Sequence, residues 1–151
     1  MVGTLFTGLM ITTKGPKVLE YNVRFGDPET QTLLPLMSAD TDLAEIMIAC
    51  TEDRLDTVQV KVDDKYSATV VVAAGGYPGT YAKGTPMFVE SAPADTNIFH
   101  AGTAIVEGQL QSAGGRVIAA QATGASLREA VDKAYVGRLS SPVSVEIITD
   151  N

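Results

Sequence analysis

The sequence is poor in the residues that build disulfides and zinc sites. It contains one cysteine, one histidine and no tryptophan among 151 residues. A single cysteine excludes a disulfide within the chain and fits a reducing compartment, so we expect a cytoplasmic protein. One cysteine and one histidine also cannot supply the four ligands of a structural zinc site. Cys50 ends an apolar stretch with helical spacing, which favours a packed thiol over a nucleophile.

Basic residues and long apolar runs are also scarce. There are 11 Lys and Arg against 18 Asp and Glu, a formal net charge of −7. Without a basic patch, neither nucleic acid nor an anionic membrane surface is an expected partner. No apolar run approaches the ~20 residues of a membrane-spanning helix. The motifs GxSxG, HExxH and GxxxxGK[ST] are missing, so the signatures of common serine hydrolases, zinc proteases and P-loop proteins are excluded.

The hydrophobic pattern predicts an α+β fold with a mainly antiparallel sheet and two or three flanking helices. Apolar runs at 4–12 and 17–25, joined by "TKGP", predict a hairpin. Further strands are expected from these segments: "TVQVKV", "SATVVVAA" (a continuous β-branched run typical of a central strand), "NIFH" through "QATG" with turns at Glu107-Gly108 and Gly114-Gly115, and "VSVEIIT".

Polar residues that precede apolar segments predict the helices. A short helix is expected at 29–36, and a second follows the capping cluster Ser38–Asp42. A third begins after Ser126, with Glu129 at the capping-box position. The composition changes near residues 53–57, which predicts two domains, 1–55 and 56–151.

The segment "KVLEYNVRFGDPETQ", residues 17–31, carries the most chemistry. Alternation along a strand would line up Glu20, Asn22 and Arg24 on one face, and turn Leu19, Tyr21, Val23 and Phe25 to the core. One interpretation is an ordinary strand with a solvated polar face. The other is the wall of an active site. Asparagine is a poor strand former, so its presence in a predicted strand indicates that its side chain makes a specific contact.

The residue types on this face fit phosphate chemistry. A carboxylate beside an amide oxygen suits a hard cation such as Mg²⁺. An arginine one step further suits a phosphate or a phosphoryl group in transfer. Two more acids, Asp27 and Glu29, follow where the strand is expected to leave the sheet.

Three sequence blocks together resemble a known family. They are "FTGLMITTKGPKVLEYNVRFGDPETQTLLPL", "VVVAAGGYPGTYAKG" and "IFHAGTAI" with "GGRVIAAQATG". In this order they resemble the C-terminal portion of the phosphoribosylamine–glycine ligases, or glycinamide ribonucleotide synthetases, of the ATP-grasp superfamily. The resemblance implies ATP-dependent joining of glycine to phosphoribosylamine in purine biosynthesis, through a glycyl phosphate, with release of ADP and phosphate.

The resemblance also implies roles for the polar side chains of the segment 17–31. Glu20 and Asn22 would be ligands of the Mg²⁺ or Mn²⁺ bound with ATP. Arg24 would steady the phosphoryl group and the acyl phosphate. Asp27 would hold the amine substrate, and Glu29 is a weaker candidate beside it. Positioning and charge neutralisation are what phosphoryl transfer needs.

Four features of the second half leave alternatives open. Arg116 follows Gly114-Gly115 and either holds the ribose 5-phosphate or faces solvent; Lys83 is a weaker alternative for the phosphate. The segment 75–84 is better explained as a structural turn than as a phosphate loop. His100 is better explained as a structural histidine than as a catalytic one.

The resemblance covers only part of such a ligase. The N-terminal domain and the lid region have no counterpart, and residues 137–151 depart from the family pattern. We therefore expect a C-terminal portion that is inactive alone, with apolar surface left exposed for oligomers or for the missing regions. The alternatives are a non-catalytic β-rich binding or scaffold module derived from the ligase, and another ATP-grasp carboxylate–amine ligase.

Overall fold

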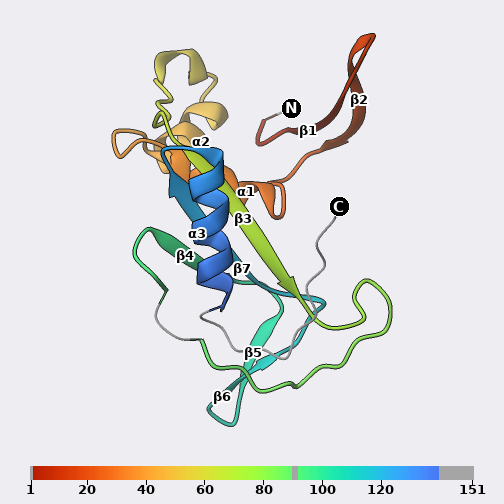
Figure 1. Ribbon diagram of the computed structural model, residues 1–151. Helices are drawn as coiled ribbons and strands as arrows, with labels where there is room; N and C mark the ends of the chain where they lie inside the picture. The colour runs from red at the N-terminus through yellow and green to blue at the C-terminus, as the bar shows by residue number, and fades with distance from the viewer. Residues whose placement is uncertain (1, 90–91, 140–151) are drawn as a thin grey trace. The chain divides into compact units, whose positions relative to one another are not determined.

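The computed structural model describes residues 2–89 and 92–139. The chain divides into two compact units, Met1–Asp63 and Asp64–Asn151, and each is described by itself (Figure 1). Within the described ranges there are seven strands and three α-helices, and every strand pairing is antiparallel. The predicted α+β class is confirmed. The domain limits 1–55 and 56–151 stay a prediction.

A β-hairpin begins the first unit. Strands β1 (Phe6–Thr12) and β2 (Gly15–Asn22) pair across a two-residue turn, which confirms the predicted hairpin. Strand β2 ends at Asn22, three residues earlier than predicted. Asn22 pairs with Phe6, the first residue of β1, so the segment that follows has no partner in this hairpin. Arg24 therefore lies beyond the strand.

A β-bulge at Leu19 sets which side chains share a face. Gly8 pairs with Glu20 and Leu9 pairs with Val18, so Leu19 is an extra residue without a partner in β1. Paired residues point to the same face. The two faces of the hairpin therefore differ, and we call them the polar face (Phe6, Gly8, Met10, Lys17, Glu20, Asn22) and the apolar face (Thr7, Leu9, Ile11, Pro16, Val18, Tyr21).

The predicted burial of Leu19, Tyr21, Val23 and Phe25 is wrong for this chain. All four side chains are exposed. The sheet that carries the first two has only two strands in the described part of the chain, and it lacks a covering layer there. The alternating pattern identifies which side chains are apolar, but a side chain is buried only where another strand or helix packs against it.

Two helices complete the first unit, together with short 3₁₀ turns. Helix α1 (Glu29–Leu33) runs into η1 (Leu34–Leu36), as expected for 29–36. Helix α2 (Leu43–Thr51) is capped by Asp42, whose Oδ1 accepts the Ala44 and Glu45 N–H groups at 2.8 and 3.3 Å. The cap satisfies donors that the first helical turn leaves open.

The strand predicted from "TVQVKV" at 57–62 is wrong. Thr57 ends the 3₁₀ turn η2 (Leu55–Thr57), and the segment makes only one isolated bridge, between Val62 and Met37. Alternating valines predict a strand, but a strand also needs a partner along its length. The described residues offer one only at Met37.

The second unit contains a three-stranded sheet with β7 at its centre. Its order is β3 (Tyr66–Ala73), β7 (Arg116–Gly124) and β4 (Thr96–His100). A separate hairpin joins β5 (Thr103–Val106) to β6 (Gln109–Ser112). In the described ranges β3 pairs only with β7, so its β-branched run lies at an edge of this sheet there, against expectation. The strand predicted at "VSVEIIT" lies outside the described residues.

Small side chains let helix α3 (Leu127–Leu139) pack closely on this sheet (Figure 1). Ala130 and Ala134 are fully buried, and a side chain at Gly137 would overlap Thr96. Ser126 Oγ accepts the Glu129 N–H at 3.2 Å, which confirms the predicted cap. No helix in the described ranges is long and apolar enough to cross a membrane.

A buried glutamine ties the three strands together. Gln121 is 0% exposed; its Nε2 donates to Ser67 Oγ at 2.9 Å and its Oε1 accepts from Asn97 Nδ2 at 2.7 Å. One side chain thus bonds both neighbouring strands. Buried polar groups contribute to stability only when such partners are present.

We expect Gln121→Ala to destabilise the protein by about 2–4 kcal/mol, because it opens a cavity and removes both hydrogen bonds. Urea unfolding monitored by circular dichroism measures this loss. The exposed Gln59 is the matched control, and Gln59→Ala should change the unfolding free energy by less than ~0.5 kcal/mol. Equal effects at the two positions would contradict the assigned network.

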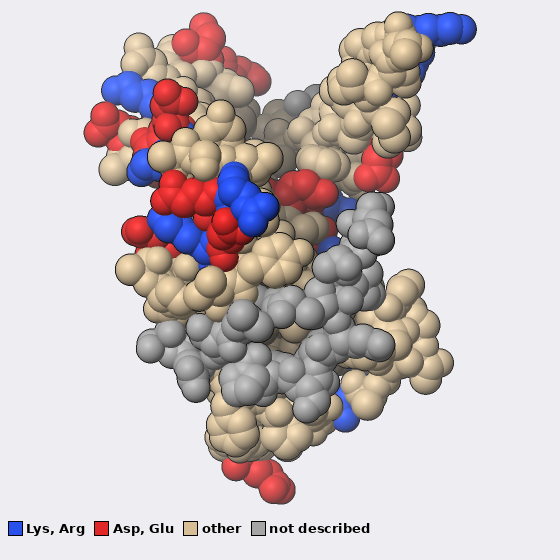
Figure 2. All heavy atoms as spheres, in the orientation of Figure 1, with Lys and Arg blue, Asp and Glu red and all other residues tan. Residues whose placement is uncertain are grey.

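Charged side chains of both signs gather over α3 (Figure 2). Lys133 Nζ lies 2.9 Å from Glu129 Oε1 and 3.5 Å from Asp95 Oδ2. Glu129 Oε2 also accepts the Ala125 N–H at 2.9 Å. The Lys133 ammonium, and then the Ala125 N–H, hold the pKa of Glu129 below its ordinary value of 4.5.

A pKa lowered by folding contributes stability above the unfolded value and loses it as pH falls through the folded value. Amide exchange at the start of α3 should therefore accelerate as pH is lowered from about 5 to 3, after correction for intrinsic exchange rates. In Glu129→Gln this acceleration should shrink, whereas the exposed Glu107→Gln should leave it unchanged. An unaltered pH response in Glu129→Gln would assign the effect to another carboxyl group.

Candidate functional site

Glu20 and Asn22 lie side by side on the polar face of β2. Asn22 Nδ2 donates to Glu20 Oε1 at 3.0 Å, which leaves the amide oxygen of Asn22 directed away from the carboxylate. Glu20 is exposed and Asn22 is partly exposed. The structure therefore brings together the two residues predicted as metal ligands.

A pocket beside this pair brings in a second carboxylate. It has a volume of about 510 Å³ and is lined by residues of the hairpin and of α1: Phe6, Thr7, Gly8, Leu9, Leu19, Glu20 and Glu29. A β-carbon at Gly8 would stand 3.1 Å from Glu20 Cγ, so glycine leaves room for the glutamate to lie across β1. Glu29, the weaker candidate from the sequence, thus shares a pocket with Glu20.

Arg24 is directed elsewhere in this structure. Its Nη1 donates to the neighbouring Phe25 carbonyl at 2.9 Å. Since β2 ends at Asn22, the backbone no longer holds Arg24 in the alternation that was predicted to align it with Glu20. Of the three side chains predicted to lie in a row, Glu20 and Asn22 share a face of β2, and Arg24 lies in the loop that follows the strand.

Asp27 is held by the helix that follows it. Gln31 Nε2 donates to Asp27 Oδ1 at 3.0 Å, and the Thr30 N–H donates to the Gly26 carbonyl at 3.3 Å. A β-carbon at Gly26 would stand 2.5 Å from Glu29 Oε2, so only glycine lets the Glu29 carboxylate fold back there. The "GDPETQ" turn thus holds Asp27 through Gln31, and Gly26 leaves room for the Glu29 carboxylate.

Three of these supporting residues, Gly8, Gly26 and Gln31, were not predicted from the sequence. Gln31 follows Asp27 by four positions, the spacing of neighbours on a helix, and could have been found from that. Gly8 could not, because its partnership with Glu20 depends on the bulge at Leu19.

Arg116 begins β7 in the second unit, beside the glycine-rich segment 75–84. Tyr77 and Tyr81 of this segment pair with ring centroids 6.1 Å apart, and both rings lie against Gly115. The Ala74 N–H donates to the Gly115 carbonyl at 2.7 Å. The segment is thus a packed turn, as expected, and it lies beside the backbone that precedes Arg116.

We expect Gly115→Ala to displace this turn and to cost about 1–3 kcal/mol, because the new methyl group would overlap the Tyr77 ring. A double-mutant cycle measured by urea unfolding checks this. In a Tyr77→Ala background the cost of Gly115→Ala should fall by at least ~0.5 kcal/mol. An additive cycle would show that the ring does not constrain the glycine.

His100 and Lys83 are both exposed in the second unit. His100 Nδ1 lies 3.1 Å from Thr103 Oγ1, at the bend between β4 and β5. This contact agrees with a structural histidine. Lys83 is exposed on the segment 75–84.

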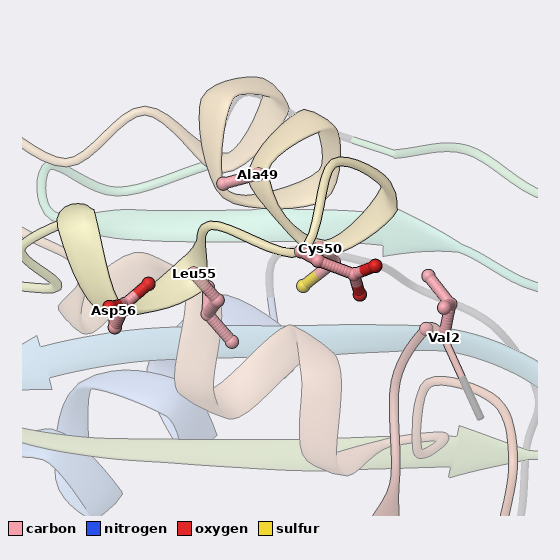
Figure 3. Close-up of a pocket in the computed structure, with 7 residues that line it drawn as sticks. Val2, Ala49, Cys50, Leu55 and Asp56 are labelled. Atoms are coloured by element: carbon pink, nitrogen blue, oxygen red, sulfur yellow. The ribbon is translucent and has the colours of Figure 1, made fainter.

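A second pocket in the first unit, of about 370 Å³, contains the only thiol. It is lined at the end of α2 by Cys50, Asp53, Leu55, Asp56 and Ala49, together with Val2 and Gly3. Figure 3 shows the Cys50 sulfur between Leu55 and Val2. Cys50 is partly exposed, so it is less tightly packed than the sequence indicated.

Glu20 and Asn22 supply two oxygen donors, which fit a metal ion that takes its other ligands from a bound molecule and from water. Within residues 2–89 and 92–139 no group of three or more His, Cys, Asp or Glu side chains is placed to hold a metal. One carboxylate and one amide oxygen are nevertheless hard donors that Mg²⁺ accepts, with waters and phosphate oxygens filling the other positions. To share one ion with Glu20, the Asn22 amide would have to turn its oxygen, in place of its NH₂ group, toward the carboxylate. The pair therefore suits a metal bound together with a phosphate compound.

Two family profiles match the chain. The "Phosphoribosylglycinamide synthetase, C domain" matches residues 67–143, and the "Phosphoribosylglycinamide synthetase, ATP-grasp (A) domain" matches residues 1–30. The second match contains the hairpin with Glu20 and Asn22, and the first contains Arg116.

Curated relatives and a solved structure agree with these matches. The bifunctional purine biosynthetic protein PUR2,5 of Pichia angusta is 61% identical over 140 residues, which are 91% of this chain and 18% of that protein. The phosphoribosylamine–glycine ligase of Rhizobium meliloti is 48% identical over 134 residues, 88% of this chain and 31% of the ligase. The crystal structure of phosphoribosylamine–glycine ligase from Thermotoga maritima is similar with a TM-score of 0.79 and 32% identity, over 95% of this chain and 35% of that one. The chain thus spans a fifth to a third of the length of these relatives.

Proposed function

Because the chain belongs to the phosphoribosylglycinamide synthetase family, we propose that it forms part of a ligase that joins glycine to 5-phosphoribosylamine. ATP is hydrolysed to ADP and phosphate in this reaction, which proceeds through a glycyl phosphate. The observation that carries the proposal is the Glu20–Asn22 pair, which lies within the residues that match the ATP-grasp domain. The compartment we propose is the cytoplasm.

Glu20 and Asn22 would hold the Mg²⁺ or Mn²⁺ that accompanies ATP. When bound, such an ion neutralises phosphate charge and orients the nucleotide. The side chains contribute a carboxylate and an amide oxygen on one strand face, and the backbone pairing of β2 with β1 keeps both in register. Phosphoryl transfer gains mainly from this kind of positioning.

The residues after β2 would bind the reacting groups. Arg24 would contact the transferred phosphoryl group after it releases the Phe25 carbonyl, an exposed hydrogen bond whose loss costs only about 1 kcal/mol. Asp27, oriented by Gln31, would bind the amine substrate. Glu29 would add a second negative charge to the Glu20 pocket, where it would favour an ammonium group or a cation.

Arg116 would bind the 5-phosphate of phosphoribosylamine. A guanidinium offers two parallel N–H donors to a phosphate, and this fixes orientation as well as charge. The support is its place at the start of β7, next to Gly115 and the packed turn formed by Tyr77 and Tyr81.

A chimaera tests the proposal. In the Rhizobium meliloti ligase the matched segment is replaced by the corresponding residues of this chain, and ADP release is measured with glycine and phosphoribosylamine. The chimaera should be active, whereas the 151-residue chain alone should release no ADP. Glu20→Gln in the chimaera should lower kcat by at least ~100-fold, since a metal ligand contributes several kcal/mol of charge stabilisation.

The control is Glu107→Gln, which changes an exposed glutamate at the β5–β6 turn and should leave kcat within a factor of about two. A chimaera that folds but remains inactive would contradict the proposed function. Full activity in Glu20→Gln would contradict the assigned metal ligand.

A further inference from the structure

A β-bulge in β7 decides which face of the sheet carries Arg116. Val72 pairs with Ile118, and the next residue, Ala73, pairs with Arg116. Val117 is therefore an extra residue without a partner in β3. Val117 and Ile118 are both 0% exposed and belong to one core cluster. Since paired residues point to the same face, Arg116 follows Ala73 and is turned to the face opposite Ile118.

The backbone of Arg116 is hydrogen-bonded on two sides. The Gly102 N–H donates to the Arg116 carbonyl at 2.8 Å, and the Ala74 N–H donates to the Gly115 carbonyl at 2.7 Å. These carbonyls belong to the two peptide units that flank the Arg116 α-carbon, so both of its backbone dihedral angles are constrained. A β-carbon at Gly102 would stand 2.6 Å from the Arg116 carbonyl oxygen, so only glycine lets the bend after β4 approach this closely.

Two tyrosine rings hold the residue that precedes Arg116. A β-carbon at Gly115 would overlap the Tyr77 ring and stand 3.1 Å from the Tyr81 ring. Tyr81 also packs against the core cluster of the second unit. The Tyr77 N–H donates to the Ala74 carbonyl at 2.9 Å, and Ala74 is the residue whose own N–H holds the Gly115 carbonyl. The ring and the backbone of one turn thus act together on Gly115.

Such a fixed starting point matters for an arginine that binds phosphate. The guanidinium offers two parallel N–H donors, and their direction depends on where the long side chain begins. A binding group displaced by about 1 Å can cost about 100-fold in rate. The bulge at Val117, the two hydrogen bonds and the tyrosine rings all act on the residues 115–117.

We propose that Tyr77 is a positioning residue, which sets the direction of the Arg116 side chain for binding a phosphate. The Tyr77 ring fixes the Gly115 α-carbon, and Arg116 leaves the next peptide unit on the face that the bulge determines. Tyr81, whose ring centroid lies 6.1 Å from that of Tyr77, supports the ring from the core. This inference rests on the proposed function only for the phosphate, which is the 5-phosphate of phosphoribosylamine.

Steady-state kinetics of the chimaera described above test the proposal. Tyr77→Leu removes the ring but keeps an apolar side chain. The KM for phosphoribosylamine should rise at least about tenfold, while the KM values for ATP and glycine stay within a factor of about two. Tyr77→Phe should keep the wild-type values, because ring carbons meet Gly115. Tyr66→Leu is the matched control: Tyr66 pairs with Gly124 at the opposite end of β7, so none of the three KM values should change.

A double-mutant cycle separates positioning from a general loss of structure. Arg116→Ala alone should raise the KM for phosphoribosylamine, and adding Tyr77→Leu should raise it by less than about twofold more, because the ring acts only through Arg116. An undiminished effect of Tyr77→Leu in the Arg116→Ala background, or an equal rise of all three KM values in Tyr77→Leu alone, would overturn the proposal. If Tyr77→Leu fails to fold, Gly115→Ala disturbs the same contact from the backbone side and should give the same selective rise.

A measurement on the 151-residue chain keeps this inference apart from the proposed function. The NMR order parameter of the Arg116 Nε–Hε bond, assigned by its loss in Arg116→Lys, should fall by at least ~0.1 in Tyr77→Leu and stay unchanged in Tyr66→Leu. An unchanged order parameter in Tyr77→Leu would overturn the proposal. A lowered one, together with an unaltered KM for phosphoribosylamine in the Arg116→Ala chimaera, would support the positioning of Arg116 and contradict the proposed phosphate site.

Discussion

The alternation of side chains along β1 and β2, shifted once by a bulge, is the constraint on which the site depends. Cross-strand pairing places Glu20 opposite Gly8 and Asn22 opposite Phe6. If Leu19 were paired regularly with Gly8 and there were no bulge, Glu20 would lie opposite Thr7, on the face that carries Val18 and Ile11, since a one-residue slip exchanges the faces of a strand. The bulge thus keeps Glu20 on the polar face, with Asn22.

The second unit depends on small side chains at its centre. Strand β7 contains the buried Ala119, Ala120 and Ala122, and such small side chains let α3 pack closely on the sheet. Gln121 interrupts this run, and its buried amide bonds Ser67 on one side and Asn97 on the other. The same strand begins at Arg116, so the most tightly packed element of the unit also holds the residue proposed for phosphate binding.

Features with a local signal could be predicted from the sequence. The hairpin, the caps of α2 and α3, and the short helix after Pro28 all depend on residues a few positions apart. Features that depend on a partner distant in the sequence could not be predicted. In the described part of the chain the alternating valines at 58–62 form a single β-bridge, between Val62 and Met37, and β3 has a strand partner on one side only, although its sequence is typical of a central strand. The end of β2 at Asn22 follows in turn from the start of β1.

At the candidate site the sequence alone identified the chemistry: an acid, an amide and an arginine of the types that phosphate and metal binding require, and two acids beside them. Their grouping came from the fold. Glu29 joins Glu20 in one pocket, Gln31 orients Asp27, and Arg24 lies in a loop outside the strand pair. Residue type is a local property and can be read along the chain. Which residues meet depends on hydrogen-bond register and on helix and turn geometry, and these arise only when segments of the chain pair in space.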